Sequence, residues 1–375
     1  MEKPEDLRLP IISLSKDIPD NELVQQIASA CSEFGSFQVV SHGIAPELIQ
    51  AFNVQCKRYF NLPHETKLQW KRNEGNARGF FDDELTKQRR DWKEALDFGV
   101  PRSRDWTTPD RSSENLCLDG WNQLPSEDVM PNFRPTVIRY FEACAELSDR
   151  LAVLMAKGMN RDENEPIVQK LREKHSSYLR VNYYPPCQNE DNEDTEDESK
   201  PLGISPHRDA GFLTVLLQDD DCHSLQVWKD DRWILVHPIP GALTINTGDM
   251  AQIWSNGRYV APLHRVLTNP KKVRYSAPFF YNPSYDTWVK PLVEDDKPAV
   301  YHPVLWGYFR AVRFAGDLTD LGVEIQIDHF LKAKPSGHLE TQTRFAREAD
   351  FDAPFSVKKY RAMLTNIEEH VENSQ

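Results

Sequence analysis

Apolar residues in the amino-terminal part of the chain recur three and four positions apart, the spacing that places them on one face of a helix. Asn21 stands where it could cap the first such segment, and Pro46 suits the first turn of the second. Short apolar runs that favour strands lie before and between these segments. The pattern predicts helices at about 21–33, 46–59 and 131–158, and strands at 9–14 and 36–43.

The pattern changes at residue 177 to short runs rich in β-branched and aromatic residues, separated by Gly, Pro, Asp and Asn. No helical segment long enough to connect parallel strands lies between these runs, so we expect a mainly β region, either a sandwich or a barrel. The runs are 177–185, 212–219, 224–236, 242–254, 264–269 and 275–282. Helical spacing returns after Pro303, and the polar segment 338–352 is expected to pack loosely on the outside.

Charge and composition exclude several classes of protein. The 375 residues carry a formal net charge of −13, which argues against non-specific nucleic-acid binding, because a phosphate-binding surface needs a positive excess. No apolar run reaches the roughly 18 residues of a spanning helix, and the first ten residues do not have the order of a signal peptide. The six cysteines form no C-x-x-C pair. We expect a cytoplasmic protein with reduced cysteines and without a membrane partner.

Much of the negative charge is local. Residues 188–200 contain seven acidic residues and one lysine, and no large apolar side chain. Such a block cannot offset the entropy lost on ordering, so the sequence predicts a mobile acidic insertion.

A candidate metal site lies in the β region. His207 and Asp209 are two apart, so on one strand their side chains point to the same face. With His264 from a later run they would supply two imidazoles and one carboxylate, the facial triad that leaves open positions on a non-haem Fe(II). H-x-D alone is a weak signal, because it is short enough to occur by chance.

A second group supports the first. Arg274 and Ser276 share one strand face, and a guanidinium beside a hydroxyl is suited to binding a carboxylate. Asn182 and Tyr184 also alternate onto a common face and could hold the same ligand. A ligand that chelates iron through a 2-oxo acid and reaches Arg274 with a distal carboxylate would be 2-oxoglutarate.

At this point the sequence resembles the isopenicillin N synthase-like family of Fe(II)/2-oxoglutarate-dependent oxygenases over most of residues 9–315. The blocks that carry the resemblance follow the family's order: LPIISL, FGSFQVVSHGI, YFNLPHETK, RDWKEALDFG, LRVNYYPPC, H-x-D with its downstream histidine, GDMAQIWSNGRY, HRV and R-x-S. The resemblance implies iron ligands at His207, Asp209 and His264, and 2-oxoglutarate on Arg274 and Ser276, with Asn182 and Tyr184 in the same pocket. His42 in the second block is interpreted as a structural hydrogen-bonding residue.

The resemblance also implies a fold and a reaction. We expect a double-stranded β-helix (jelly-roll) core with an N-terminal α/β extension and C-terminal helices. The regions expected are 1–130 (N-terminal region), 131–176 (scaffold helix), 177–300 (core) and 301–375 (C-terminal helices). Fe(II), 2-oxoglutarate and O₂, with ascorbate as a stimulant, would serve oxidation of a C–H bond of a small molecule by a monomer. Because the iron centre would carry out the oxidation, no side chain is assigned as a general acid or base.

Substrate contacts are expected from family topology at seven residues: Arg72, Arg78, Phe80, Trp254, Arg258, Phe280 and Arg310. The arginines would suit an anionic or amino-acid substrate. Hydroxylation, desaturation and oxidative cyclisation remain open. Two other functions also remain open, an iron oxidase of this fold that does not use 2-oxoglutarate and a non-catalytic jelly roll that binds a ligand.

Overall fold

The computed structural model describes residues 7–86, 89–103, 106, 116–187, 201–219, 221–294, 297–318, 324–354 and 356–364. The acidic segment 188–200, predicted to be a mobile insertion, lies outside these residues. None of the helices in the described ranges combines the length and apolar character needed to cross a membrane.

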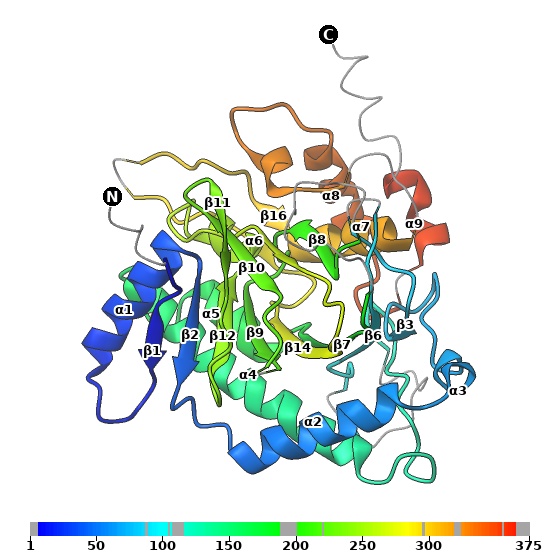
Figure 1. Cartoon of the computed structure of the whole chain (residues 1–375). Helices are drawn as coiled ribbons and strands as arrows, with labels where there is room; N and C mark the ends of the chain where they lie inside the picture. The colour runs from blue at the N-terminus through cyan, green and yellow to red at the C-terminus, as the bar shows by residue number, and fades with distance from the viewer. Residues whose placement is uncertain are drawn as a thin grey trace.

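Helices lie at both ends of the chain and strands dominate its centre (Figure 1). The helices are α1 (Asp20–Glu33), α2 (Pro46–Phe60), α3 (His64–Leu68), α4 (Phe133–Gly158), α5 (Pro166–Glu173), α6 (Asp249–Trp254), α7 (Trp306–Leu318), α8 (His338–Glu348) and α9 (Val357–Leu364), with a 3₁₀ turn at Ile327–Phe330. The strands are β1 (Ile11–Ser13), β2 (Ser36–Val40), β3 (Gly79–Phe81), β4 (Leu85–Thr86), β5 (Arg89–Arg90), β6 (Glu94–Gly99), β7 (Tyr178–Tyr184), β8 (Ile204–His207), β9 (Leu213–Gln218), β10 (Leu225–Lys229), β11 (Arg232–Leu235), β12 (Leu243–Thr247), β13 (His264–Val266), β14 (Arg274–Tyr281), β15 (Trp288–Val289) and β16 (Val304–Leu305).

Two sheets form the core. The larger has the order β1-β2-β12-β9-β14-β7-β6-β3, and the smaller has the order β11-β10-β13-β8. All pairs are antiparallel except β1 with β2. The N-terminal strands thus extend the same sheet as the central strands. The predicted jelly-roll core, with an N-terminal α/β part and C-terminal helices, is confirmed.

Strand alternation gives the larger sheet two different faces. One face packs in the hydrophobic core, and the other lines an internal cavity. On the core side lie Leu179 and Val181 (β7), Val215 and Leu217 (β9), Leu243 and Ile245 (β12), and Ala277 and Phe279 (β14). On the cavity side lie Arg180 and Asn182 (β7), Thr214 and Leu216 (β9), Thr244 and Asn246 (β12), and Arg274 and Ser276 (β14). The larger sheet therefore contributes mostly polar side chains to the cavity, and Leu216 is the apolar exception among these eight.

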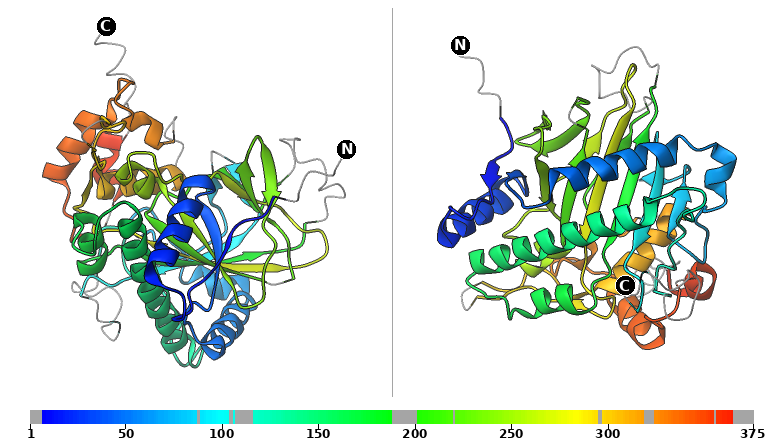
Figure 2. Two further views of the ribbon diagram at one scale, coloured as in Figure 1. Left: turned by 90° about the vertical axis from the view of Figure 1, so that its left-hand side faces the viewer. Right: turned by 90° about the horizontal axis from the view of Figure 1, so that it is seen from below.

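Helices cover the core side of the larger sheet. Figure 2 shows α2 and α4 running side by side across the sheet in the view from below. The helix α4 contacts β9 and β14 as well as α1, α2 and α5. The buried side chains Phe141 and Leu151 on α4 and Phe52 on α2 belong to one hydrophobic core with this sheet face.

Three local predictions are corrected. Pro19, not Asn21, occupies the N-cap of α1, and no side chain caps it. The predicted strand 242–254 ends at Thr247, and its second half is helix α6, because Gly248 begins a turn and the apolar residues after it then follow a helical spacing. The segment expected to pack loosely forms α8, where Phe345 is fully buried among core residues.

Candidate active site

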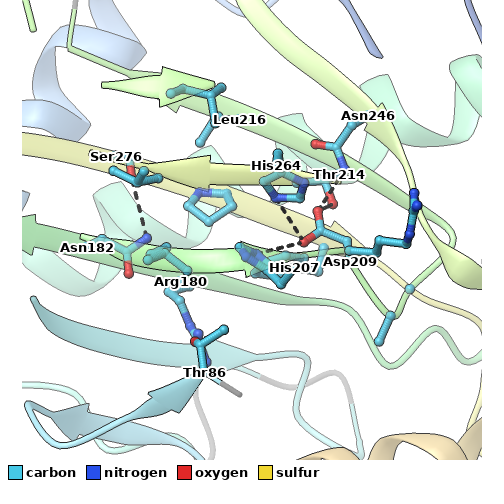
Figure 3. Close-up of a pocket in the computed structure, with 18 of the residues that line it drawn as sticks. Thr86, Arg180, Asn182, His207, Asp209, Thr214, Leu216, Asn246, His264 and Ser276 are labelled. Carbon is cyan, nitrogen blue, oxygen red and sulfur yellow. Dashed lines mark hydrogen bonds and ion pairs between the residues drawn. The ribbon is translucent and has the colours of Figure 1, made fainter. Parts of the chain in front are cut away.

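Two paired strands of the smaller sheet bring the predicted metal ligands together. His207 ends β8 and His264 begins β13, and the two are direct partners in the antiparallel register. Asp209 lies two residues beyond the end of β8. The Nε2 atoms of His207 and His264 lie 3.7 and 3.6 Å from Asp209 Oδ1. Figure 3 shows the three side chains converging on one point of the cavity. Their ligand atoms all lie within 4.8 Å of one another.

Backbone carbonyls orient both imidazoles. Nδ1 of His207 lies 2.8 Å from the carbonyl oxygen of Ser205, and Nδ1 of His264 lies 3.1 Å from that of Pro262. A carbonyl only accepts hydrogen bonds, so in each ring Nδ1 carries the proton and Nε2 keeps a free lone pair. Outer partners of this kind fix the tautomer of a metal-binding histidine.

Asp209 is held through one of its two oxygens. Oδ2 accepts hydrogen bonds from Thr214 Oγ1 at 2.6 Å and Asn246 Nδ2 at 2.7 Å. Oδ1 is the atom that faces the two histidines. Burial opposes ionisation of this carboxyl, but the histidines and the two hydrogen bonds outweigh it and lower the pKa of Asp209. The side chain is therefore a carboxylate at neutral pH, as a metal ligand must be.

Burial also opposes the charged form of His207, and here it prevails. Desolvation, together with the nearby His264, lowers the pKa of His207 to about 3. The imidazole is thus neutral at physiological pH and can donate its lone pair. Two imidazoles and one carboxylate are a donor set suited to a divalent iron with open coordination positions.

Strand pairing also brings the second predicted group together. On β14 and β7, Arg274 is the register partner of Tyr184, and Ser276 is the partner of Asn182. Asn182 Nδ2 donates to Ser276 Oγ at 3.3 Å, and the Arg274 guanidinium lies 4.9 Å from the centre of the Tyr184 ring. All four residues line the cavity that contains the triad.

The arginine in this group has unused donors. Arg274 is only 2% exposed and donates from Nη2 to Gln218 Oε1 at 3.4 Å. In the part of the chain that the structure describes, its Nε and Nη1 have no acceptor, and neither does Asn182 Oδ1 have a donor. A buried guanidinium with unpaired donors is costly. A carboxylate in the cavity would supply the missing acceptors, so these residues fit the distal end of a dicarboxylate.

Comparisons with known proteins agree with this geometry. Residues 175–283 match the model of the 2OG-Fe(II) oxygenase superfamily, and residues 9–127 match the N-terminal model of non-haem dioxygenases in morphine synthesis. Jasmonate-induced oxygenase 2 of Arabidopsis thaliana is 33% identical over 80% of this chain and 78% of its own length. Gibberellin 2-beta-dioxygenase 8 of the same plant is 31% identical over 87% of this chain and 88% of its own length.

A solved structure extends the similarity to three dimensions. The structure of JOX2 in complex with 2OG, Fe and JA superposes with a TM-score of 0.67, at 32% identity, over 82% of this chain and 86% of that chain. The chain belongs to the 2OG-Fe(II) oxygenase superfamily. It is a 2-oxoglutarate- and Fe(II)-dependent oxygenase that acts on a small molecule.

Of the seven side chains predicted to contact the substrate, the cavity of this oxygenase contains two, Phe280 and Arg310. Phe280 lies on β14, two positions beyond Pro278 on the same face. Arg310 projects from α7, and its guanidinium lies 5.1 Å from the centre of the Tyr178 ring. Both therefore form the part of the cavity wall beyond the triad, away from Arg274.

The structure does not bring the other five to this cavity, because each has contacts elsewhere. Arg72 pairs with Glu84 and stacks on Phe81, and Arg78 binds Asp119 and the carbonyl of Val100. Phe80 and Trp254 are buried in the hydrophobic core, and exposed Arg258 faces Glu294. Hydrophobic pattern and family topology did not reveal these partners, because the acids that pair with Arg72 and Arg78 are 12 and 41 residues further along the chain.

An ionic network along the cavity wall was not predicted. Arg180 forms a bidentate pair with Asp97, both bonds being 2.8 Å, and donates to Glu84 at 2.9 Å. Lys93 lies 2.6 Å from Glu84 and 2.9 Å from Asp91. With Arg72 the network has three cations and three carboxylates and is neutral overall. The alternating charges of RDWKEALDFG were the signal in the sequence, but their partners could not be read from it.

A second buried acid was also missed. Asp249 is the first residue of α6, and its N–H donates to the carbonyl oxygen of Asp209 at 2.7 Å. Its carboxyl oxygens are buried and accept no hydrogen bond from the described residues. Burial raises the pKa of Asp249 to about 7. Its backbone thus fixes the loop that carries a metal ligand.

Proposed function

We propose that this oxygenase oxidises an unactivated C–H bond of a small organic acid. His207, Asp209 and His264 hold Fe(II), and Arg274 and Ser276 bind the distal carboxylate of 2-oxoglutarate beside Asn182 and Tyr184. The observation that carries these roles is that one cavity contains both the triad and Arg274, whose Nε and Nη1 have no acceptor among the described residues. When bound, iron and 2-oxoglutarate supply the oxidising power, and the protein supplies placement.

The wall opposite Arg274 supports an acidic substrate. Arg310, Arg313 and Arg208 line it. Arg313 pairs with Glu324, and Arg208 donates to the carbonyl of Ala261. Arg310 is buried and its guanidinium lies 5.1 Å from the centre of the Tyr178 ring, so all three arginines place positive charge on this wall, which favours an anionic group. The presence of JA in the JOX2 structure is consistent with a small-molecule ligand in such a cavity.

Release of ¹⁴CO₂ and succinate from 2-oxoglutarate tests this function. Small carboxylic acids and their neutral methyl esters are supplied with Fe(II) and O₂, and products are identified by mass to separate hydroxylation, desaturation and cyclisation. An acid is expected to stimulate turnover, and its ester is not. Oxygen consumption without any use of 2-oxoglutarate would contradict the proposal and favour an oxidase of the same fold.

A pair of variants tests the role of Arg310. Arg310→Gln should raise KM for the acid about 10- to 150-fold, the loss expected for a hydrogen bond to a charged group. Arg258→Gln is the matched control, because Arg258 does not line the cavity and lies on the surface beside Glu294. Equal KM values for the two variants would remove Arg310 from the substrate site.

We further propose that the enzyme works as a cytoplasmic monomer without a nucleic-acid partner. The net charge of −13 supports the last point, because it opposes binding to phosphate backbones. Light scattering at micromolar concentration should give the mass of one chain. A dimer mass would contradict the monomer.

A further inference from the structure

The strand that carries His207 lies at the edge of its sheet. In the order β11-β10-β13-β8, strand β8 has only β13 as a neighbour among the described strands. The segment just before β6, which contains Asp91 and Trp92, covers this open edge instead. The N–H of Trp92 donates to the carbonyl of Leu202 at 3.0 Å, and the N–H of Ser205 donates to Asp91 Oδ1 at 3.3 Å. A carboxylate and one peptide group thus take the place of a neighbouring strand.

Ser205 connects this edge to the metal site. Its N–H binds Asp91, and its carbonyl oxygen accepts the hydrogen bond from His207 Nδ1 at 2.8 Å. The same residue is therefore held from outside by Asp91 and orients the imidazole on the inside. A shift of Ser205 would change both the position of the carbonyl and the direction of the histidine ring.

Asp91 is itself rigidly held. Its Oδ2 accepts hydrogen bonds from Thr86 Oγ1 at 2.8 Å and Lys93 Nζ at 2.9 Å. Lys93 is anchored in turn by Glu84 at 2.6 Å. The Asp91 side chain is buried, so its position is set by these contacts and not by solvent. A fixed carboxylate of this kind can define where the edge strand lies.

We propose that Asp91 is a positioning residue for the metal site, acting on His207 through Ser205. The inference rests on the proposed function, since it takes His207 as an iron ligand. It goes beyond that function by assigning a role in metal binding to the N-terminal segment, which supplies none of the ligands.

Metal affinity separates this role from ordinary stabilisation. Co(II) is titrated into metal-free protein without O₂, with a competing chelator, and the visible spectrum of the bound ion reports its coordination. Asp91→Ala is expected to raise the dissociation constant about tenfold, the lower end of the range for outer-shell partners, because Asp91 acts through one further residue. Asp91→Asn keeps an acceptor for Ser205 and should lose less affinity.

Asp97→Asn is the matched control. Asp97 is buried in the same ionic network and pairs with Arg180, but it makes no hydrogen bond to β8. It should lower the melting temperature and leave Co(II) affinity unchanged. An unchanged dissociation constant in Asp91→Ala, or an equal loss in Asp97→Asn, would overturn the inference.

Co(II) affinities of two further variants, Asp91→Asn and His207→Ala, complete the test. If Asp91→Ala does not fold, the comparison of Asp91→Asn with Asp97→Asn decides, and equal affinities overturn the proposal. His207→Ala should abolish Co(II) binding. If it does so while the Asp91 variants bind normally, only the positioning role fails. If His207→Ala binds Co(II) like the intact protein, the metal site and the positioning role both fail.

Discussion

Asp209 uses its two oxygens differently. Oδ1 faces His207 and His264, whereas Oδ2 accepts hydrogen bonds from Thr214 and Asn246. These two donors lie on neighbouring strands β9 and β12, where Asn246 and Thr214 are register partners. The larger sheet therefore sets the direction in which a ligand from the smaller sheet points.

Removal of either donor should weaken metal binding. Thr214→Val and Asn246→Ala are each expected to lower Fe(II) affinity about 10- to 100-fold, because Oδ1 would no longer be held toward the histidines. Anaerobic titration with Fe(II) measures the effect. Thr244→Val is the control, since Thr244 lines the same cavity without contacting Asp209. Affinities that match the control would contradict the role of these donors.

At the scale of single residues, short sequence motifs predicted which side chains the fold brings together. H-x-D and R-x-S place their members two apart, and strand alternation then puts each pair on one side of the backbone. Arg72 and Arg78, predicted to contact the substrate, do not line the cavity and pair with Glu84 and Asp119, because a charged residue shows its partner only after folding. Thr214 and Asn246 were missed for the same reason, since both read as ordinary strand residues.

Among the elements, helix α8 departs most from its prediction. Its sequence is mostly polar, yet His338, Gln342 and Phe345 are buried. Hydrogen bonds join His338 to Tyr308 on α7 and Gln342 to Leu305 on β16. His338 Nδ1 and the Tyr308 hydroxyl are joined by a hydrogen bond of 2.8 Å. Hydrogen bonds between polar side chains of α8 and buried groups therefore stabilise the position of this helix. The hydrophobic pattern of the sequence could not predict these hydrogen bonds.

The pH dependence of stability tests the burial of α8. Burial, with help from His329, lowers the pKa of His338 to about 3. Unfolded histidine has a pKa near 6.5, so between about 3 and 6.5 the unfolded state binds the extra proton and stability falls as the pH falls. His338→Asn should reduce the loss between pH 6.5 and 5 by up to about 1.4 kcal/mol per pH unit, as measured by urea denaturation of metal-free protein. The variant keeps the similar contribution of His207, and an unchanged slope would contradict the burial of a neutral His338.

Most strands and the long helices could be predicted because their apolar residues follow a clear period. Helix α6 could not, since MAQIW is apolar enough to suit either element and only the turn at Gly248 decides. The boundaries of the four regions stay a prediction. The larger sheet spans the first two boundaries, because β3 pairs with β6 in the first region and β6 pairs with β7 in the third.

The whole molecule is connected through that shared sheet and the ionic network beside it. Arg180 on β7 pairs with Asp97 on the neighbouring β6, and Glu84 joins the same group. Breaking a buried ion pair leaves a charge without its partner, which costs about 3–5 kcal/mol. The N-terminal region and the core should therefore unfold together.

Asp97→Asn tests this coupling. Urea unfolding followed by far-UV circular dichroism and by tryptophan fluorescence should give coincident transitions for the intact protein. The variant should lose about 3–5 kcal/mol by both probes. Two separate transitions, with only one moved by the substitution, would show that the two regions fold independently.

We propose that one cavity holds iron at the triad and 2-oxoglutarate between that iron and Arg274. Anaerobic titration of the Fe(II)-loaded protein with 2-oxoglutarate, followed through the charge-transfer absorption of the chelate, tests it most directly. We predict a band that saturates with one 2-oxoglutarate per chain and is absent in His207→Ala. Arg274→Met should need about 10- to 150-fold more 2-oxoglutarate to reach the same final band. No band in the intact protein, or the same saturation curve for Arg274→Met, would contradict binding of 2-oxoglutarate between the iron and Arg274.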